Sequence, residues 1–556
     1  MKKRYILFLV PFILYIGLLG VLPQLEPDEV RYSLIPSAMN ESGNYVTPQL
    51  KHIIYLEKPP LVYWATALSF KILGENDFSA RLFVGLCAWG CILLAYFIGR
   101  NFRDEKTGLY AAAILTISAF PFLLGRINIL DTPLTFFICL SIWLGYLALN
   151  KQKHKYYFYL FYFSCALAFL TKGVIGVVFP FAILFVWLLW TGRWRELWKL
   201  FSPVGILIFL IVVCPWLIMA QKENSDFLYF FFVREHLLRF TTKMHDKIEP
   251  FYYYLPIIIG GILPWCVYLI KAWPVRSIRE VLFTKDENRL LLVWIFFIFL
   301  FYTLSSSKLA TYIAPVFLPI ALLAGNIFRN YEENAIDISG KKEIFYRIAV
   351  ILQSSIIIIT LLLPPILNKY SDPTIGLVVI TSGNWWLYII LPLIAALLMT
   401  FLPEIIEQKF RRAWFISIYV LCVILLAGSL LPGKDFFAPY RSSLVAKDAI
   451  SLYVPKDHDL YQYRVNFYGI DFYNKIRTPI VEDFGEMREG ILKLPPAEIN
   501  RYFLTGEGFF QLCAQRKDVY CITQHKDKFD EIKTKVRHVD VLWDNKAFYL
   551  LHISNQ

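Results

Sequence analysis

Charged residues are scarce in this chain of 556 residues, because Asp, Glu, Lys and Arg together make up only 18% of it. Soluble globular domains carry about 25% charged residues, so the composition excludes an ordinary soluble protein. Hydrophobic residues reach 57%, with 47 Phe, 34 Tyr and 15 Trp among the aromatic side chains. The sequence therefore predicts a polytopic membrane protein with room for about a dozen spans and one further domain.

Signals for nucleic-acid binding and for internal repeats are also missing. The net charge is +13, but most basic residues punctuate the apolar segments as topology signals do, so we expect no nucleic-acid partner. Seven of the nine cysteines fall within apolar runs and are expected to be core residues. Only Cys513 and Cys521 lie in the polar tail, where both a disulfide bond and two free thiols are compatible with the sequence.

Apolar runs long enough to cross a membrane dominate the first three quarters of the chain. The first follows Met1-Lys2-Lys3-Arg4 without a small-residue cleavage site, and we interpret it as a retained helix. The sequence predicts a mainly α-helical transmembrane bundle of about 13 spans over residues 1–432. The runs lie near residues 5–22, 79–99, 108–125, 131–149, 157–171, 174–191, 200–220, 251–270, 290–305, 309–327, 346–367, 384–402 and 413–431.

Basic clusters indicate the orientation of the bundle. Lys2, Lys3 and Arg4 place the N-terminus in the cytoplasm by the positive-inside rule. The later clusters fall on the same side under one alternation of spans; they begin at Arg100, Lys151, Arg193, Lys271, Lys341 and Lys409. The outer side then receives the loops at 23–78, 126–130, 172–173, 221–250, 305–308 and 368–383.

The tail over residues 433–556 has a different pattern. Short alternating runs at 501–504, 519–522 and 539–543 are typical of strands, and helix-like polar stretches separate them. We therefore expect a small α/β domain on the outer side of the membrane.

Ionisable side chains gather in the outer loops, where they are costly unless they bind or react with something. The acidic set suits a base or a divalent-metal site and consists of Asp28, Glu57 and Asp131, with His236. The basic set suits a phosphate clamp and consists of Arg31, Lys58, Lys172, Arg239 and Lys308, to which Tyr32 and Tyr312 are assigned as further donor-binding residues. No Asp-x-Asp motif and no close His/Cys spacing accompanies the acids, so the residues alone support a metal site only weakly.

Each of these residues also has a simpler interpretation without catalysis. Asp28 is a favourable N-terminal cap for the helix expected over residues 31–40. Glu57 and Lys58 would form a solvated pair, and Lys172 would snorkel toward the membrane surface. His236 and Tyr312 would be ordinary interfacial residues. The functional hypothesis depends on all the charged loops facing one side.

The outer side also limits the donor of any transfer reaction. That space in a bacterium contains no nucleotide sugars or ATP, so a transferase there needs a donor already in the membrane, such as a polyprenyl-phosphate sugar. Its leaving group is a phosphate, which a basic clamp would stabilise as negative charge develops. A lipid flippase or transporter is the alternative from another class, but it would need charges at mid-bilayer and paired halves with broken helices.

Several loop motifs follow the order and spacing of a known family. They are the segments 26–32 (EPDEVRY), 55–59 (YLEKP), 130–131 (LD), 171–173 (TKG), 234–236 (REH) and 308–312 (KLATY). In these motifs the chain resembles the lipid A 4-amino-4-deoxy-L-arabinose transferases, integral-membrane glycosyltransferases of the GT-C class. The resemblance runs from residue 1 to about 330 and more weakly to the end, and the same pattern is similar to protein O-mannosyltransferases.

The resemblance implies a bacterial inner-membrane enzyme that takes amino-arabinose from undecaprenyl phosphate and gives it to a lipid A phosphate, with polymyxin resistance as the outcome. It implies that Asp28 and Asp131 are functional acids, that Lys58 and the arginines bind the donor phosphate, and that Glu57 and His236 hold a divalent cation. The segment 60–64 (PLVYW) has a form found widely in the superfamily. Transfer of another polyprenyl-linked sugar to a protein or glycan therefore remains the alternative.

Overall fold

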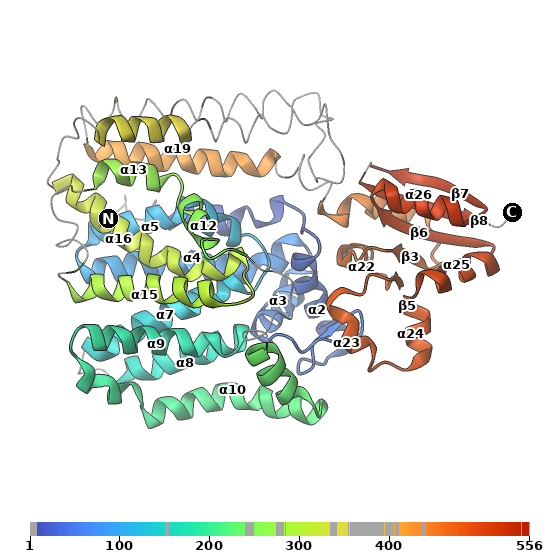
Figure 1. Ribbon diagram of the computed structural model, residues 1–556, viewed down its shortest axis with the longest axis horizontal. Helices are drawn as coiled ribbons and strands as arrows, with labels where there is room; N and C mark the ends of the chain where they lie inside the picture. The colour runs from blue at the N-terminus through green and yellow to red at the C-terminus, as the bar shows by residue number, and fades with distance from the viewer. Residues whose placement is uncertain are drawn as a thin grey trace.

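The computed structural model describes residues 8–150, 155–238, 249–273, 285–333, 342–353, 411–432, 441–545 and 547–554, with a few single positions between them. In this part of the chain, a helical bundle occupies one end of the molecule and a six-stranded sheet with its helices occupies the other (Figure 1). The helices α2 (Asp28–Ser42) and α3 (Leu61–Leu73) lie where the two parts meet. The expected combination of a helical bundle and a C-terminal α/β region is confirmed.

Long apolar helices form the bundle. Within the described residues, six helices are long and apolar enough to cross a membrane, and the pair α12 (Tyr254–Gly261) and α13 (Trp265–Ala272) passes the same test as one broken span. The six are α4 (Asp77–Phe102), α7 (Asp131–Asn150), α10 (Pro203–Glu223), α15 (Asp286–Leu304), η5 with α16 (Ala310–Glu333) and the stretch Ala413–Leu430 of α19. Shorter helices complete the bundle: Phe8–Val21, α5 (Glu105–Ile117), α6 (Ala119–Leu124), α8 (Tyr156–Lys172) and α9 (Ile175–Trp190).

The expected number of 13 spans is not confirmed. The run expected over 108–125 is divided into α5 and α6 at Ser118, whose backbone is extended (φ −64°, ψ 128°). The run expected over 251–270 is bent by 79° between α12 and α13. The runs expected over 346–367 and 384–402 lie largely outside the described residues. Run length and composition do not report such breaks, because the sequence stays apolar on both sides of them.

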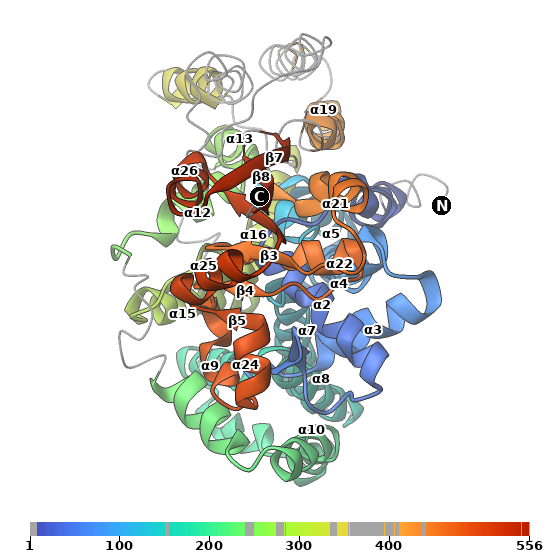
Figure 2. The ribbon, with the colours of Figure 1, turned by 90° about the vertical axis from the view of Figure 1, so that its right-hand side faces the viewer.

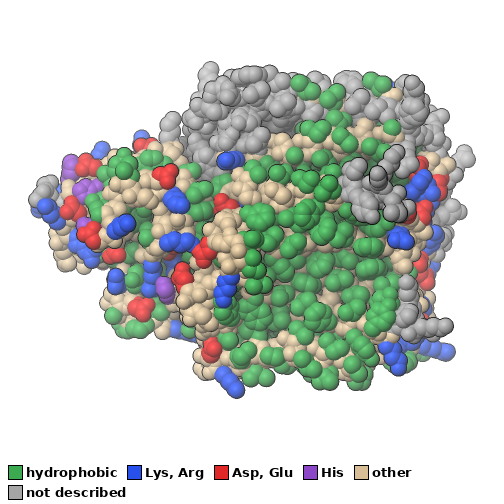
Figure 3. Space-filling model, turned by 180° about the vertical axis from the view of Figure 1, so that it is seen from behind, with side chains coloured by type: hydrophobic (Ala, Val, Ile, Leu, Met, Phe, Trp, Pro, Cys, Tyr) green, Lys and Arg blue, Asp and Glu red, His purple; other side chains and the backbone are tan. Residues whose placement is uncertain are grey.

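A wide apolar band covers one face of the bundle, and charged side chains gather at both of its ends (Figure 3). Separately, α10 exposes large apolar side chains such as Leu207 (56% exposed) and Ile211 (62% exposed). Single exposed apolar residues are common in soluble proteins, but a continuous band of them is a surface for lipid. The bundle is therefore embedded in a membrane.

A buried ion pair fixes the first outer loop to the bundle. Glu29 is 2% exposed, and its carboxylate accepts hydrogen bonds from Arg81 Nε at 2.5 Å and from Nη2 at 2.8 Å. The same guanidinium donates to the backbone carbonyls of Leu19, Leu22 and Pro23. Carbonyls at a helix end lack some of their intrahelical partners. Arg81 therefore satisfies the end of the first helix while Glu29 balances its charge.

Six strands form the C-terminal sheet in the order β5-β4-β3-β6-β8-β7. The strands β3 (Leu460–Tyr463), β4 (Ile480–Val481), β5 (Phe503–Leu504) and β6 (Asp518–Gln524) pair in parallel, whereas β8 (Phe548–Ser554) is antiparallel to β6 and to β7 (His538–Asp544). The strands expected near 501–504, 519–522 and 539–543 are thus β5, β6 and β7. Cys513 and Cys521 are both buried and free, so these two thiols form no disulfide bond.

Glu26 docks the C-terminal domain on the first loop. Its carboxylate accepts hydrogen bonds from Ser443 Oγ at 2.5 Å and from the backbone N–H groups of Tyr468 at 3.1 Å and Gly469 at 2.7 Å. The two N–H groups begin α22 (Tyr468–Asn474), and a helix N-terminus favours a carboxylate. Burial raises the pKa of Glu26 to about 7, against the opposing effect of these donors.

A second buried ion pair supports the same docking. Lys51 lies at the tip of the hairpin formed by β1 (Gln49–Leu50) and β2 (Ile53–Ile54), and its Nζ is 2.9 Å from Asp471 Oδ2. Lys51 Nζ also donates to Thr478 Oγ1 at 2.9 Å. Figure 2 faces this domain and shows it laid over the end of the bundle, with α22 in front of α2. Removing one partner of such a pair costs about 3–5 kcal/mol, so the docking geometry is strongly specified.

We expect Gly469→Ala to loosen the C-terminal domain from the first loop. A Cβ at this position would lie 2.2 Å from Ser443 Oγ and 2.6 Å from Glu26 Oε1, so the hydrogen bonds to Glu26 must open. Hydrogen exchange of residues 22–30 and 466–474 should rise severalfold. Gly428→Ala is the control, because a Cβ there meets nothing within 4 Å. Equal exchange in both variants would contradict the importance of this contact.

Candidate active site

The predicted site residues gather at the end of the bundle that meets the C-terminal domain. They come from the start of α2 (Asp28, Arg31, Tyr32), the segment before α3 (Glu57, Lys58), the start of α7 (Asp131), the end of α8 (Lys172), and the segment leading into η5 (Ala310–Val316), which carries Lys308 and Tyr312. One buried cluster joins three of these elements through Tyr32, Tyr63 and Leu130. The structure therefore brings together loops that lie far apart in the sequence.

Asp131 and Lys172 form an ion pair inside this region. Their Oδ1 and Nζ atoms are 2.6 Å apart, and the two side chains are only 12% and 13% exposed. The Lys172 ammonium also lies 4.5 Å from the centroid of the Tyr312 ring. Lys172 is thus turned into the protein toward Asp131, and the interpretation as a snorkelling lysine is wrong.

Lys308 is a buried cation of a different kind. It is 8% exposed, and its Nζ donates to the backbone carbonyl of Ser305 at 2.9 Å. Across the described ranges, no carboxylate oxygen lies within the 4.0 Å of its Nζ that an ion pair requires. A buried ammonium without a counter-ion is unfavourable. This position therefore favours an anionic ligand.

Lys58 lies between two carboxylates. Its Nζ is 3.7 Å from Glu57 Oε2 and 3.5 Å from Glu235 Oε2, and the three side chains are 10% to 16% exposed. Because the pair is largely buried, the interpretation as a solvated Glu57–Lys58 pair is wrong. Glu235 lies in η4 (Tyr229–Leu238) and was not among the predicted site residues, although it stands in the REH motif directly before His236.

Asp28 is the first residue of α2 and pairs with Arg31. The distance from Asp28 Oδ1 to Arg31 Nη2 is 2.7 Å, with the acid 66% exposed and the arginine 9% exposed. The helix begins at Asp28 itself, with Pro27 as its N-cap, so Asp28 does not cap a helix that starts at Arg31. An exposed carboxylate held by a buried arginine suits a group that meets a substrate from outside the protein.

Two polar residues of the second outer loop bind the protein itself. Arg126 donates to two backbone carbonyls of the first helix. The N–H of Asn128 donates to Glu29 Oε1 at 3.0 Å, and its Nδ2 donates to Ser33 Oγ at 3.0 Å. These contacts position the loop that leads into Asp131, while Arg126 Nε and Asn128 Oδ1 are buried and make no hydrogen bond with any described group.

The predicted metal site stays a prediction. Arg239 lies outside the described residues, and His236 lies in η4 with a side chain that is also outside the described part. Where side chains are described, no group of three His, Cys, Asp or Glu residues could hold a metal ion. The Lys58 ammonium already lies between Glu57 and Glu235. A divalent cation bound to Glu57 would therefore have to displace this ammonium.

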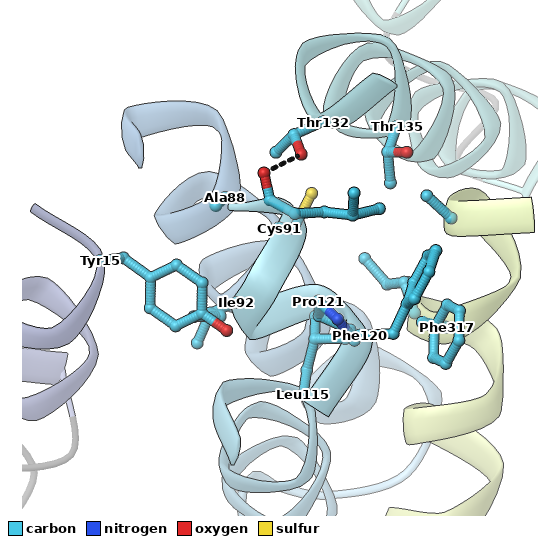
Figure 4. Close-up of a pocket in the computed structure, with 13 residues that line it drawn as sticks. Tyr15, Ala88, Cys91, Ile92, Leu115, Phe120, Pro121, Thr132, Thr135 and Phe317 are labelled. Carbon is cyan, nitrogen blue, oxygen red and sulfur yellow. Dashed lines mark hydrogen bonds between the residues drawn. The ribbon is translucent and has the colours of Figure 1, made fainter. Parts of the chain in front are cut away.

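A small apolar pocket lies among the helices of the bundle. Side chains from α4, α6, α7 and α16 line it, including Cys91 and Phe317 (Figure 4). Thr132, one residue after Asp131, is also part of its wall. Its volume is about 40 Å³. Thr132 Oγ1 donates to the Leu124 carbonyl at 2.9 Å, so the hydroxyl in the pocket wall has an internal partner. The residues that line the pocket carry no charge, and neither Asp131 nor Lys172 is one of them.

Comparison with solved structures defines the class of the fold. The crystal structure of ArnT from Cupriavidus metallidurans bound to undecaprenyl phosphate matches with a TM-score of 0.81 and 20% identity, covering 99% of this chain and 98% of that one. The apo structure of the same protein matches equally well. The chain therefore has the GT-C fold of that membrane protein.

Sequence comparison then identifies the particular relatives. The family described as dolichyl-phosphate-mannose-protein mannosyltransferase matches residues 57–219, which include Lys58, Asp131 and Lys172. An undecaprenyl phosphate-alpha-4-amino-4-deoxy-L-arabinose arabinosyl transferase of Pseudomonas fluorescens (strain Pf0-1) is 33% identical over 341 residues, covering 59% of this chain and 60% of the relative. The enzyme of that name from Pseudomonas aeruginosa (strain UCBPP-PA14) is 33% identical over 310 residues, 54% of this chain and 55% of the relative. The resemblance carried by the loop motifs is confirmed over somewhat more than half the length of these relatives.

We expect Lys308→Met to preserve or raise the thermal stability of the protein and, if the chain binds the ligand of the ArnT structure, to weaken the affinity for undecaprenyl phosphate about tenfold or more. The substitution removes a buried charge that has no carboxylate partner among the described residues, so the fold loses little. Lys172→Met is the matched control, because it leaves the Asp131 carboxylate buried without its ion pair and should lower the melting temperature. A fall in stability for Lys308→Met, with affinity unchanged, would make Lys308 a structural residue.

Proposed function

We propose that this protein transfers 4-amino-4-deoxy-L-arabinose from undecaprenyl phosphate to a phosphate of lipid A. The observation that carries the proposal is the buried Lys308 cation, which lies at the end of the bundle that also carries the Asp131–Lys172 and Asp28–Arg31 pairs. A polyprenyl phosphate places one anionic group at a membrane surface and an apolar chain in the bilayer. The anionic group would meet the buried cation, and the apolar chain would lie along the bundle. The named activity of the relatives and the ligand of the ArnT structure support this assignment.

The reaction breaks the bond between the anomeric carbon of the sugar and the oxygen of the donor phosphate, and forms a bond from that carbon to an acceptor oxygen. Undecaprenyl phosphate leaves as an anion. In the proposal, Lys58, Arg239 and Lys308 bind this phosphate, because fixed cations stabilise charge that develops on a leaving group. Lys172 and Tyr312 complete the donor site, and Arg31 and Tyr32 border it from α2.

The acceptor determines what the acids must do. A phosphate monoester has a second pKa of about 6, so it is largely an anionic nucleophile at neutral pH and needs no base. Asp28 would then stabilise positive charge on the sugar or orient the acceptor. Asp131 would hold the Lys172 ammonium against Tyr312. A divalent cation on Glu57 and His236 is a further part of the proposal, and loss of affinity for undecaprenyl phosphate after chelation would support it.

A second candidate is the transfer of another polyprenyl-linked sugar to a protein or glycan hydroxyl. The match to the mannosyltransferase family over residues 57–219 favours it, since this segment contains much of the candidate site. A hydroxyl acceptor must lose a proton during attack, and a positioned carboxylate such as Asp28 would be its base. A flippase, in contrast, would consume no donor.

We also propose that the candidate site and the C-terminal domain face the periplasm, as the basic clusters indicate. Asp457, whose side chain is 81% exposed in that domain, offers a position for a reporter. Asp457→Cys should react with a membrane-impermeant thiol reagent in intact spheroplasts. Reaction only after lysis would reverse the orientation and remove the argument for a lipid-linked donor.

We expect Asp28→Asn to abolish sugar transfer in a protein that still folds and inserts. The amide keeps the size of the carboxylate but not its charge, so it neither stabilises a cationic sugar nor accepts a proton. Donor consumption by the purified protein in detergent measures the effect. Asp457→Asn, which changes an exposed acid remote in sequence, is the control and should retain full activity. If Asp28→Asn retained activity, the role of Asp28 would be limited to the N-terminus of α2.

The mass of lipid A tests the proposal as a whole. In cells that make the amino-arabinose donor, expression of this chain should add one pentosamine to one or both lipid A phosphates. The Asp28→Asn variant should leave the mass unchanged. If the wild-type chain consumes the donor lipid while lipid A keeps its mass, the acceptor is wrong and the second candidate stands.

A further inference from the structure

The helix α10 lies at the edge of the bundle and turns a narrow stripe of residues toward the protein (Figure 1). Its buried residues are Gly205, Val213, Trp216 and Ala220, and the last three recur at the spacing of one helix face. These three form a buried cluster with side chains of α8 and with Leu56 of the first outer loop. Trp216 is the largest of them and is 1% exposed. This face therefore joins α10 to the loop that carries Lys58.

The indole N–H of Trp216 binds the backbone of that loop. Its Nε1 donates to the carbonyl of Val46 at 3.1 Å. Two residues further on, the Pro48 carbonyl accepts a hydrogen bond from the N–H of Tyr55 at 2.8 Å, across the base of the hairpin formed by β1 and β2. Lys58 follows Tyr55 by three residues. A two-stranded hairpin is at best marginally stable by itself, so the position of the segment after it depends on contacts with the rest of the protein.

Polar residues at the end of α10 bind the same part of the loop. Thr47 Oγ1 donates to Glu223 Oε2 at 2.5 Å, and it accepts a hydrogen bond from Asn224 Nδ2 at 2.9 Å. Asn44 Nδ2 donates to the same Glu223 oxygen at 3.2 Å. Thr47 is 5% exposed, so its hydroxyl is bound by these side chains instead of by bulk water. The segment 44–47 is thereby fixed to the end of α10.

The Trp216 ring also contacts the element that carries Glu235. Its centroid lies 5.9 Å from that of Phe231, and the two rings meet edge to face. Phe231 belongs to η4 and stands four residues before Glu235. Leu56, two residues before Lys58, lies in the same buried cluster as both rings. One side chain therefore supports both partners of the contact between Lys58 Nζ and Glu235 Oε2, which are 3.5 Å apart.

We propose that Trp216 is a positioning residue of the candidate active site, which holds the Lys58 ammonium beside Glu235, where the donor phosphate binds. The inference rests on the proposed function, because that function assigns the donor phosphate to Lys58. Trp216 acts through the segment 44–47 and through Phe231, and not by contact with a substrate. Its effect on binding follows from geometry, since a displacement of about 1 Å of a group that binds a substrate is already costly.

Acylation of Lys58 in the absence of any donor lipid tests this role. The full chain in detergent is treated with an amine-reactive reagent, and modified lysines are quantified by mass spectrometry. Trp216→Phe keeps an aromatic ring but leaves the Val46 carbonyl without the indole donor. Lys58, whose side chain is 14% exposed in the wild type, should then react about threefold faster or more. Lys535, which is 48% exposed in the C-terminal domain, is the internal reference.

Trp265→Phe is the matched control. Trp265 is also fully buried, and its Nε1 also donates to a backbone carbonyl, that of Ile114, at 3.1 Å. Its ring packs on Phe328 and Phe415, which are not residues of the candidate site. This variant should change neither the acylation of Lys58 nor the affinity for undecaprenyl phosphate. In Trp216→Phe that affinity should fall about threefold or more.

A second variant covers the case in which Trp216→Phe does not fold. Thr47→Val removes the hydroxyl that binds Glu223 and so loosens the same segment, and Lys58 should again react faster. Thr523→Val is its control, because Thr523 is a buried threonine of the C-terminal domain whose hydroxyl also has an internal partner.

Three results would overturn the positioning role. They are an unchanged acylation rate of Lys58 in Trp216→Phe, an equal increase in Trp265→Phe, and faster acylation without a loss of affinity for undecaprenyl phosphate. Failure of the proposed function is a separate result. If the wild type binds no undecaprenyl phosphate, that function is wrong, while the acylation rates still decide whether Trp216 positions Lys58.

Discussion

The buried ion pair between Glu29 and Arg81 is the contact on which the candidate site depends. Glu29 accepts hydrogen bonds from Arg81, from the N–H of Leu25 at 2.9 Å and from the N–H of Asn128 at 3.0 Å. One carboxylate thus joins the end of the first helix, the start of α2 and the loop before Asp131. Removing either partner would leave an uncompensated buried charge at a cost of about 3–5 kcal/mol. The relative position of Asp28 and Asp131 therefore follows from this pair.

The three acids of the motif at 26–29 have three different roles, although they stand almost side by side. Glu26 is bound by Ser443 and by the start of α22, so it belongs to the docking of the C-terminal domain. Glu29 is bound by Arg81 in the bundle. Asp28 lies between them, is 66% exposed, and has Arg31 as its ion-pair partner. Two acids hold the segment from opposite sides, and this leaves the third available to a substrate.

Much of the site was predictable because its charged residues stand in short loops that the sequence alone locates. The sequence places Asp28, Lys58, Asp131 and Lys172 at ends of apolar runs, and the structure brings these ends together. The pairing of Asp131 with Lys172 was not predictable, because charge patterns do not report which of several cations a carboxylate meets. Glu235 and Arg81 were missed for the same reason. Arg81 stands inside an apolar run, where a single charge looks like a topology signal until its partner is known.

A membrane-embedded helical bundle with a C-terminal α/β region could be predicted from the sequence alone, because hydropathy and alternation depend only on the order of residue types. The order and spacing of the loop motifs also predicted which family the relatives belong to. Where the spans break, which acids are structural and which is exposed, and the contact of Lys51 with Thr478 more than 400 residues later all came from the tertiary structure. These features depend on desolvation and on contacts between distant segments, and neither is encoded in any local stretch of sequence.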